Sequence, residues 1–288
     1  MPRTLLVHLR LHFQLLLAPV YLWGWLIAGG GTAAPVLVGF VSFHAFLYSG
    51  ATAFNSYYDR DVGPVGGLEH PPSVVQALLP FSLAVQAFGW LLAAFVNAWF
   101  FVLYGLFVGL SVAYSHPRIR LKAHPVASLV VVGFGQGALA FCGAWTATRG
   151  DLTSVFTPDG VRGALAAMLL ILALYPLSQL YQTDEDAARG DRTLAVVWGP
   201  ARCFAFALAA TALGGSLMVS VIASRFGLVD AVVVGAGLLA QMVLLGLWAR
   251  RHDPDDILGT YRRVMRLNTA SAGALGAYLL LRLAIDSR

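Results

Sequence analysis

The sequence predicts an all-α integral membrane protein in which nine transmembrane helices surround a central cavity. Its 288 residues are 58% hydrophobic and only 11% charged, and the mean hydropathy is +0.73. Average soluble domains carry about 25% charged residues, so this composition excludes an ordinary soluble enzyme. The apolar residues form nine runs, each near the ~20 residues that cross a bilayer as a helix. We therefore expect a single membrane domain over residues 1–288.

Taken in order, the apolar runs cover residues 13–30, 35–54, 75–96, 99–114, 127–145, 164–180, 202–222, 230–248 and 267–281. The first run follows Arg3 and Arg10, a pattern that a signal peptide ending near Ala33 and Ala34 would also show. Because eight further runs follow, we expect the first one to be kept as a membrane anchor.

The distribution of basic residues predicts the orientation. If the nine runs cross the membrane in turn, 14 of the 19 Lys and Arg residues fall on the same face of the membrane as the N-terminus. The other five are Arg149, Arg162, Arg225, Arg282 and Arg288. We therefore expect a protein of the cytoplasmic (inner) membrane. By the positive-inside rule its N-terminus lies on the inner side of this membrane, and after nine spans its C-terminus lies on the outer side. The net charge of +5 then points to lipid headgroups and an anionic substrate, not to nucleic acid.

Four charged segments are expected at the cytoplasmic face. They are two acidic stretches at 55–63 and 182–190, a basic run at 116–124 and a mixed loop at 250–266. Chemistry is therefore expected at the inner membrane surface.

The two acidic stretches are related by a shift of 127 residues. This shift aligns an aromatic residue, an amide, an aspartate and a glycine: Tyr48 with Tyr175, Asn55 with Gln182, Asp59 with Asp186, and Gly63 with Gly190. The two stretches lie four spans apart, so both face the same side of the membrane. We expect two parallel four-helix repeats plus one further helix.

The spacing within each stretch favours a metal site. On a helix, residues four apart share one face, so each amide and its aspartate can point into a common space. Carboxylate oxygens are the hard ligands that Mg²⁺ prefers, together with substrate phosphate and water. The candidate metal ligands are Asn55, Asp59, Asp61, Gln182, Asp184 and Asp186, of which Asn55, Asp59 and Asp186 are also the catalytic candidates.

The nearby basic run would complete a cradle for a diphosphate carried on a lipophilic group. Arg118, Arg120 and Lys122 supply fixed positive charge beside the carboxylates. Two plainer readings stay open: the acidic residues are solvated loop charges, and the basic residues only anchor the helices at the inner face.

These residues resemble the UbiA superfamily of intramembrane prenyltransferases. Asn55 and Asp59 match the motif Asn-Asp-x-x-Asp-x-x-x-Asp after the second helix. The motif Asp-x-x-x-Asp-x-x-x-Gly-x-x-Thr-Leu after the sixth helix is matched by Asp186, Gly190, Thr193 and Leu194. The resemblance implies a Mg²⁺-dependent transfer of a prenyl group from an isoprenyl diphosphate to an aromatic or other lipophilic acceptor. It implies diphosphate binding by Arg10, Tyr114, Ser115, Arg118, Arg120, Lys122 and Arg192.

The chain departs from the family pattern at three positions. Ser56, Gly63 and Gln182 stand where the family has aspartates. Asp61 and Asp184 lie two residues from the matched aspartates and can supply the missing oxygens. We expect a rebuilt diphosphate site, with a weakened site as the alternative.

The prenyl cation formed in such a reaction must be kept from water, in a pocket that opens into lipid. Tyr57, Tyr58 and Tyr181 are candidates to stabilise it through their ring faces.

Two other functions remain. A terpene cyclase would use the same ionisation and quench the cation internally. A transporter or non-catalytic lipid-binding protein is the second, but no charged residue lies at mid-membrane depth in any predicted span, and the repeat is parallel where many transporters use inverted ones.

Overall fold

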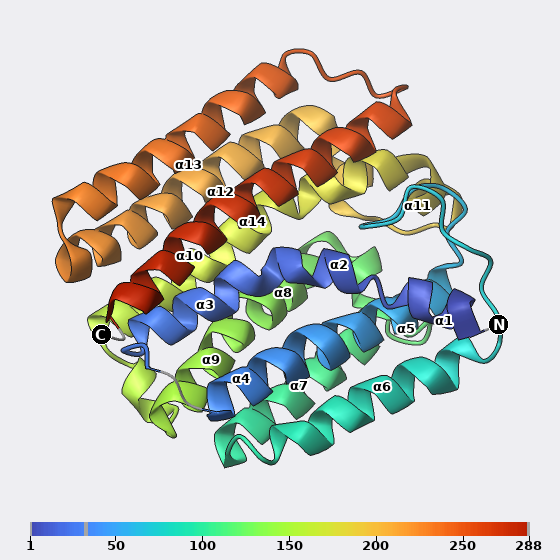
Figure 1. Ribbon diagram of the computed structural model, residues 1–288. Coiled ribbons are helices and arrows are strands. Elements are labelled where there is room, and N and C mark those ends of the chain that lie inside the picture. The colour runs from blue at the N-terminus through green and yellow to red at the C-terminus, as the bar shows by residue number, and fades with distance from the viewer. Residues whose placement is uncertain (1, 32–33, 287–288) are drawn as a thin grey trace.

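The computed structural model describes residues 2–31 and 34–286, and the regular elements in these ranges are all helical (Figure 1). The α-helices are α1 (Pro2–His8), α2 (Leu11–Gln14), α3 (Ala18–Ile27), α4 (Ala34–Val41), α5 (Ser49–Asp59), α6 (Leu78–Ala93), α7 (Ala98–Ser115), α8 (Pro125–Val132), α9 (Ala140–Arg149), α10 (Pro158–Leu174), α11 (Thr183–Ala188), α12 (Leu194–Phe226), α13 (Leu228–Ala249) and α14 (Ile257–Asp286). The longer helices run side by side, and the two ends of the chain lie at opposite ends of the bundle (Figure 1). Ala33, at the alternative cleavage position, lies outside the described residues.

Seven segments of the described chain are long and apolar enough to cross a membrane. They are Arg3–Ile27, Ala34–Asp59, Ala98–Ser115, Pro125–Arg149, Pro158–Ala188, Leu194–Phe226 and Leu228–Ala249. The two other predicted runs fall on α6 and α14. Helix α6 has 16 residues, which at a rise of ~1.5 Å per residue gives ~24 Å, short of the ~30 Å hydrocarbon layer. Helix α14 has 30 residues but begins with several arginines.

Several helices extend beyond the apolar runs because their ends are capped. The side chain of Asn97 accepts a hydrogen bond of 2.9 Å from the backbone N–H of Phe100 and starts α7. Thr157 accepts one of 3.1 Å from Gly160, and Pro158 occupies the first turn of α10. The hydrophobicity pattern therefore places the start of these helices too late, because it leaves out the polar residues of their first turns.

Four membrane-spanning segments are interrupted by a stretch that is not α-helical. The segments Arg3–Ile27 and Pro158–Ala188 contain 3₁₀ turns at η1 (Leu15–Leu17) and η6 (Pro176–Gln182), and the segments Ala34–Asp59 and Pro125–Arg149 contain π-helical segments at η2 (Ser42–Tyr48) and η4 (Gly133–Leu139). Pro176 explains η6, because proline removes a backbone donor. The π-helical segments contain no proline and are not visible in the sequence. Short 3₁₀ segments η3 (Leu121–Ala123) and η5 (Thr153–Val155) lie in loops.

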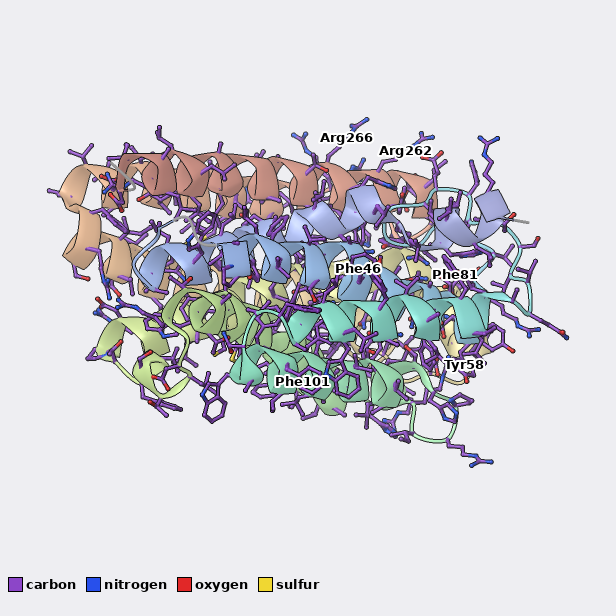
Figure 2. All side chains as sticks on the ribbon, turned by 60° about the horizontal axis from the view of Figure 1, so that its bottom comes forward. Phe46, Tyr58, Phe81, Phe101, Arg262 and Arg266 are labelled. Carbon is purple, nitrogen blue, oxygen red and sulfur yellow. The ribbon has the colours of Figure 1, made fainter. Side chains whose placement is uncertain are left out.

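Large apolar side chains cover the flanks of the bundle. Leu91 on α6, Val102 on α7 and Leu239 on α13 are all exposed. Figure 2 shows Phe101 on the outer surface, while Arg262 and Arg266 project outward from α14. In a membrane these apolar flanks face lipid. Inside, aromatic residues such as Trp23, Phe43 and Phe100 are fully buried and hold neighbouring helices together.

Candidate active site

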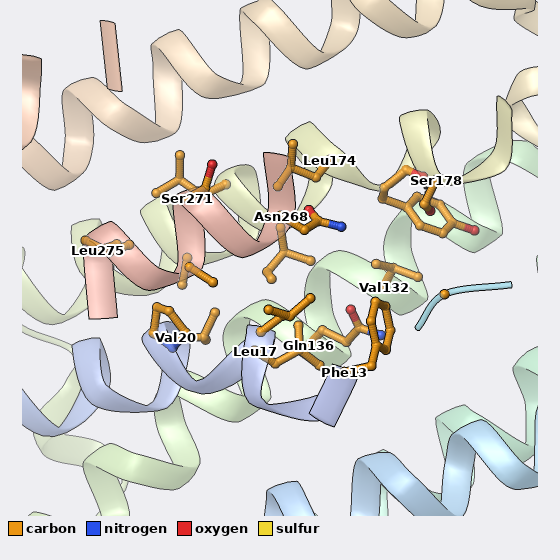
Figure 3. Close-up of a pocket in the computed structure, with 18 of the residues that line it drawn as sticks. Phe13, Leu17, Val20, Val132, Gln136, Leu174, Ser178, Asn268, Ser271 and Leu275 are labelled. Carbon is orange, nitrogen blue, oxygen red and sulfur yellow. Dashed lines mark hydrogen bonds between the residues drawn. The ribbon is translucent and has the colours of Figure 1, made fainter. Parts of the chain in front are cut away.

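A cavity of about 700 Å³ lies inside the bundle. Each of the four interrupted segments contributes to its wall, with Leu17 from η1, Tyr48 from η2, Gln136 from η4 and Ser178 from η6. Figure 3 shows Leu17, Gln136 and Ser178 around this space, with Leu275 on the α14 side. Interruptions of this kind are common at functional sites because they turn side chains out of the regular helical pattern.

Most of the wall is apolar, and one side opens to the flank of the molecule. Val233 and Leu244 of α13 line the cavity and are nevertheless 58% and 57% exposed. The opening beside α13 and α14 therefore leads to the surface that faces lipid.

Polar residues gather at one end of the cavity. Asn55, Ser115 and Gln182 line it there, and the amide of Asn55 donates a 3.0 Å hydrogen bond to the Ser115 hydroxyl. Arg10, between α1 and α2, donates to the hydroxyl of Ser56 at 2.6 Å and to the carbonyl of Gly66 at 3.0 Å. These contacts tie this end of the cavity to the first acidic stretch, through Ser56, and to the chain just after it, through Gly66.

Next to this polar end lies a buried group of acidic and basic side chains, which we call the charge cluster. Its members come from the end of α5, the loop after α7 and the end of α11: Asp59, Asp61, Arg120, Lys122, Asp186, Arg189 and Asp191. Asn55 and Asp59 share one face of α5, so this helix links the cavity to the cluster.

The basic run holds one half of the cluster. Lys122 forms a buried ion pair with Asp59, and Arg120 contacts the other oxygen of Asp59 at 3.3 Å. Arg120 also forms a two-point contact with Asp191, with distances of 2.6 and 2.7 Å. Such paired contacts are among the stronger ion pairs in proteins.

Arg189 holds the other half and joins the two acidic stretches. Its guanidinium lies 2.7 Å from Asp61 and 2.6 Å from Asp186. It also contacts the carbonyl oxygen of Asp59 at 3.3 Å and lies 3.5 Å from Asp191. The positively charged side chain of Arg189 therefore contacts both acidic stretches.

The electrostatics of the two halves differ. Burial raises the pKa of Asp61 above its usual value, and the nearby carboxylate of Asp59 adds to that rise. Burial also acts on Asp191, but hydrogen bonds and charge from Arg120 bring its pKa below the usual range. For Arg189, burial opposes the charged form, while Asp61 more than compensates and raises the pKa. Asp61 is thus a carboxylate that needs positive charge beside it to stay ionised.

Glu185 lies beside the position of one missing family aspartate. One of its oxygens accepts hydrogen bonds from the backbone N–H groups of Val62 at 3.2 Å and Gly63 at 2.7 Å. A Cβ atom at position 63 would lie only 3.2 Å from that oxygen. The second oxygen is buried and has no hydrogen-bond partner among the described residues. A carboxylate from the second stretch therefore stands where a side chain at 63 would point.

The structure gathers most of the residues singled out from the sequence. Asp59, Asp61, Arg120, Lys122 and Asp186 belong to the charge cluster, and Arg10, Asn55, Tyr114, Ser115 and Gln182 line the cavity. Three others, Arg118, Asp184 and Arg192, are exposed and stand apart from the cluster's ion pairs. Of the tyrosines considered for cation stabilisation, Tyr181 lines the cavity, whereas Tyr57 and Tyr58 are not among its lining residues.

Three residues of the site were missed in the sequence: Glu185, Arg189 and Asp191. Glu185 and Arg189 lie within the second acidic stretch, and Asp191 follows Gly190, whose φ of 78° turns the chain back after α11. The charged residues on either side of Gly190 could have marked this turn as part of the site.

The donor set suits a hard cation, but it is not assembled around one. Within residues 2–31 and 34–286, no three Asp, Glu, His or Cys side chains are grouped so that they could hold a single ion. The reason is visible in the cluster, where Arg120, Lys122 and Arg189 already occupy the carboxylates. Oxygen-only side chains such as Asp59, Asp61 and Asp186 are nevertheless the ligands that Mg²⁺ requires.

Comparison with known proteins gives a consistent result. A sequence model of the UbiA prenyltransferase family matches residues 17–269. Protoheme IX farnesyltransferase of Aeropyrum pernix is 29% identical over 168 residues, or 55% of this chain and 52% of that protein. Digeranylgeranylglyceryl phosphate synthase of Thermococcus kodakarensis is 29% identical over 201 residues, or 67% and 68%. The chain thus matches about half the length of the first of these relatives.

Solved structures share the fold. A UbiA homologue from Archaeoglobus fulgidus bound to DMAPP and Mg²⁺ superposes with a TM-score of 0.69 at 21% identity, over 98% of this chain and 99% of that one. An apo UbiA homologue from Aeropyrum pernix gives 0.71 at 18% identity, over 94% and 97%. At these identities the likeness concerns the fold.

Proposed function

The chain belongs to the UbiA prenyltransferase family, and on that premise we propose that it transfers a prenyl group from an isoprenyl diphosphate to a lipophilic or aromatic acceptor, with Mg²⁺ as cofactor. The observation that carries this proposal is the buried charge cluster at the polar end of an apolar cavity. A diphosphate with a hydrocarbon tail has the same two parts in the same order.

The cavity is suited to the prenyl chain. It runs along α14 from Leu267 to Tyr278, both of which line it, and eleven helical steps of ~1.5 Å give a length of roughly 16 Å. Its apolar wall excludes water from a prenyl cation, and its opening beside α13 gives a lipophilic acceptor a way in from the membrane. Tyr181 presents the aromatic side chain nearest in the sequence to the second motif.

The charge cluster is suited to the diphosphate. We assign Asp59, Asp61 and Asp186 as metal ligands, assisted by Asn55 and Gln182. Mg²⁺, when bound, supplies positive charge that stabilises the leaving diphosphate.

The basic residues would act on the same leaving group. Arg120 and Lys122 add fixed positive charge beside the metal ligands, and Arg10 adds another at the cavity end. Asp184 and the exposed Arg118 and Arg192 stay assigned to metal and diphosphate binding, respectively, as outer residues of this site.

We further propose that α6 and α14 also cross the membrane, as the third and ninth of nine spans, and that the N-terminus and the charge cluster lie at the cytoplasmic face. Two features support the duplicated four-helix plan. The interruptions occur in the first, second, fifth and sixth spans, and the 127-residue shift relates residues in equivalent places. Tyr48 and Tyr175 both line the cavity, and Asp59 and Asp186 both lie in the cluster.

The test is a product assay. Membranes containing the protein are incubated with labelled geranyl, farnesyl or geranylgeranyl diphosphate, Mg²⁺ and a host lipid extract, and labelled products are identified. A prenylated acceptor supports the proposal. A cyclic hydrocarbon formed without any acceptor would indicate a terpene cyclase instead, and binding without diphosphate release would indicate a lipid-binding or transport protein.

A further inference from the structure

Arg189 bridges two carboxylates that come from different motifs. The nitrogens of its guanidinium lie 2.7 Å from Asp61 in the loop after α5 and 2.6 Å from Asp186 in α11. Without it, neither of these two buried carboxylates would have an ion-pair partner among the described residues. A bridging position between acidic groups of two motifs is one that a divalent cation would also take.

The cluster needs a cation at this position even before any metal binds. The side chains of Asp61 and Asp186 are only 5% and 8% exposed. A buried carboxylate without a positively charged partner destabilises the folded chain. Arg189 meets this need, which explains how the acidic stretches can pack together in the metal-free chain.

Arg189 is also the most exposed basic residue of the cluster. Its side chain is 24% exposed, against 19% for Arg120 and 9% for Lys122. Arg120 is held by its two-point contact with Asp191, and Lys122 is enclosed. Arg189 precedes Gly190 at the end of the short helix α11, where the side chain has access to water.

We propose that Arg189 occupies the divalent-cation position between Asp61 and Asp186 in the ligand-free protein and competes with the metal for it. This inference rests on the proposed Mg²⁺ site. When metal binds, the guanidinium leaves the two carboxylates and stays close enough to pair with the anionic diphosphate. Free metal therefore binds weakly, and metal together with diphosphate binds well, because the diphosphate offers Arg189 a new partner.

The experiment measures binding of Mn²⁺, as a probe for Mg²⁺, to the full-length protein in detergent with no prenyl diphosphate present. Arg189→Gln is expected to bind Mn²⁺ roughly tenfold more tightly than wild type or better, because one competing positive charge is removed. Metal-free Arg189→Gln should also unfold at a lower temperature than wild type. Mn²⁺ should raise the unfolding temperature of the variant by more than it raises that of wild type.

The matched control is Arg60→Gln. Arg60 adjoins both Asp59 and Asp61, but it is exposed, contacts the ring of Tyr57 and takes part in none of the cluster's ion pairs. The substitution removes the same charge from the same region. Because Arg60 does not lie between the two carboxylates, Mn²⁺ affinity should stay at the wild-type level. If Arg60→Gln raises the affinity as much as Arg189→Gln, the effect is one of general charge and the proposal is wrong.

Equal or weaker Mn²⁺ binding by Arg189→Gln would also overturn the proposal, because Arg189 would then organise the ligands without competing. Should Arg189→Gln fail to fold, Arg189→Lys decides the question: a single ammonium lacks the planar fork that spans both carboxylates, so tighter binding than wild type is again expected. No turnover is measured, so a chain that lacked transferase activity would still give an answer.

Discussion

Replacing Asp59 by asparagine tests the charge cluster with the least change in shape. Asp59 forms a buried ion pair with Lys122 and a longer contact, of 3.3 Å, with Arg120. Asparagine keeps one oxygen near Arg120 but leaves Lys122, whose side chain is only 9% exposed, without its counter-charge.

The expected size follows from these two contacts. A hydrogen bond to a charged group contributes about 1.5–3 kcal/mol. Arg120 keeps its two contacts with Asp191, so most of the cost falls on Lys122. We expect a loss of about 2 kcal/mol in the free energy of unfolding, or about 4–8 °C in Tm at roughly 2–4 °C per kcal/mol. Turnover should fall by roughly 100-fold or more, because a metal ligand is lost.

Asp159→Asn is the matched control. Asp159 lies at the far end of the bundle and is also held by two arginines, Arg162 at 2.5 Å and Arg225 at 2.7 Å. Its replacement should lower Tm measurably without lowering turnover. The assays are thermal unfolding in detergent and product formation from a labelled prenyl diphosphate. Wild-type turnover in Asp59→Asn would refute the assignment of the cluster as the diphosphate site.

Three further predictions concern neighbouring carboxylates. Glu185→Gln should speed hydrogen exchange at the amides of Val62 and Gly63, because their acceptor loses its charge; unchanged exchange would show that this contact does not order the loop. Asp61→Asn should reduce turnover more than Asp184→Asn, since only Asp61 lies in the cluster, and equal losses in an activity assay would contradict that placement. The lowered pKa of Asp191 means that its contribution to stability is present above the usual Asp pKa and is lost as the pH falls through the lowered value. Asp191→Asn should therefore be less stable than wild type at neutral pH, and the gap in Tm should close in acid.

The sequence predicted the membrane class and the main helices because both depend on long apolar runs. It did not predict where helices begin, since Asn97 and Thr157 extend them through polar caps. Nor did it predict the π-helical segments η2 and η4, which line the cavity and contain no proline that would mark them. The nine-span count stays a prediction, since seven spans are found by length and composition.

For the candidate site, spacing along the helices was informative and pairing across them was not. The four-residue spacing of Asn55 and Asp59 predicted a shared face, and α5 places one in the cavity wall and the other in the cluster. No spacing rule reveals that Arg189 crosses to Asp61, because the two are separated by 128 positions in the chain. The same holds for Glu185 and Gly63, which meet only after both stretches have packed together.

The most direct measurement is pyrophosphate release by the purified protein from an isoprenyl diphosphate. Release should require Mg²⁺, stop on chelation and resume when Mg²⁺ is restored, and it should be accompanied by a prenylated acceptor from the lipid extract. If the protein binds the isoprenyl diphosphate but releases no pyrophosphate with any acceptor, the proposed transferase function is wrong.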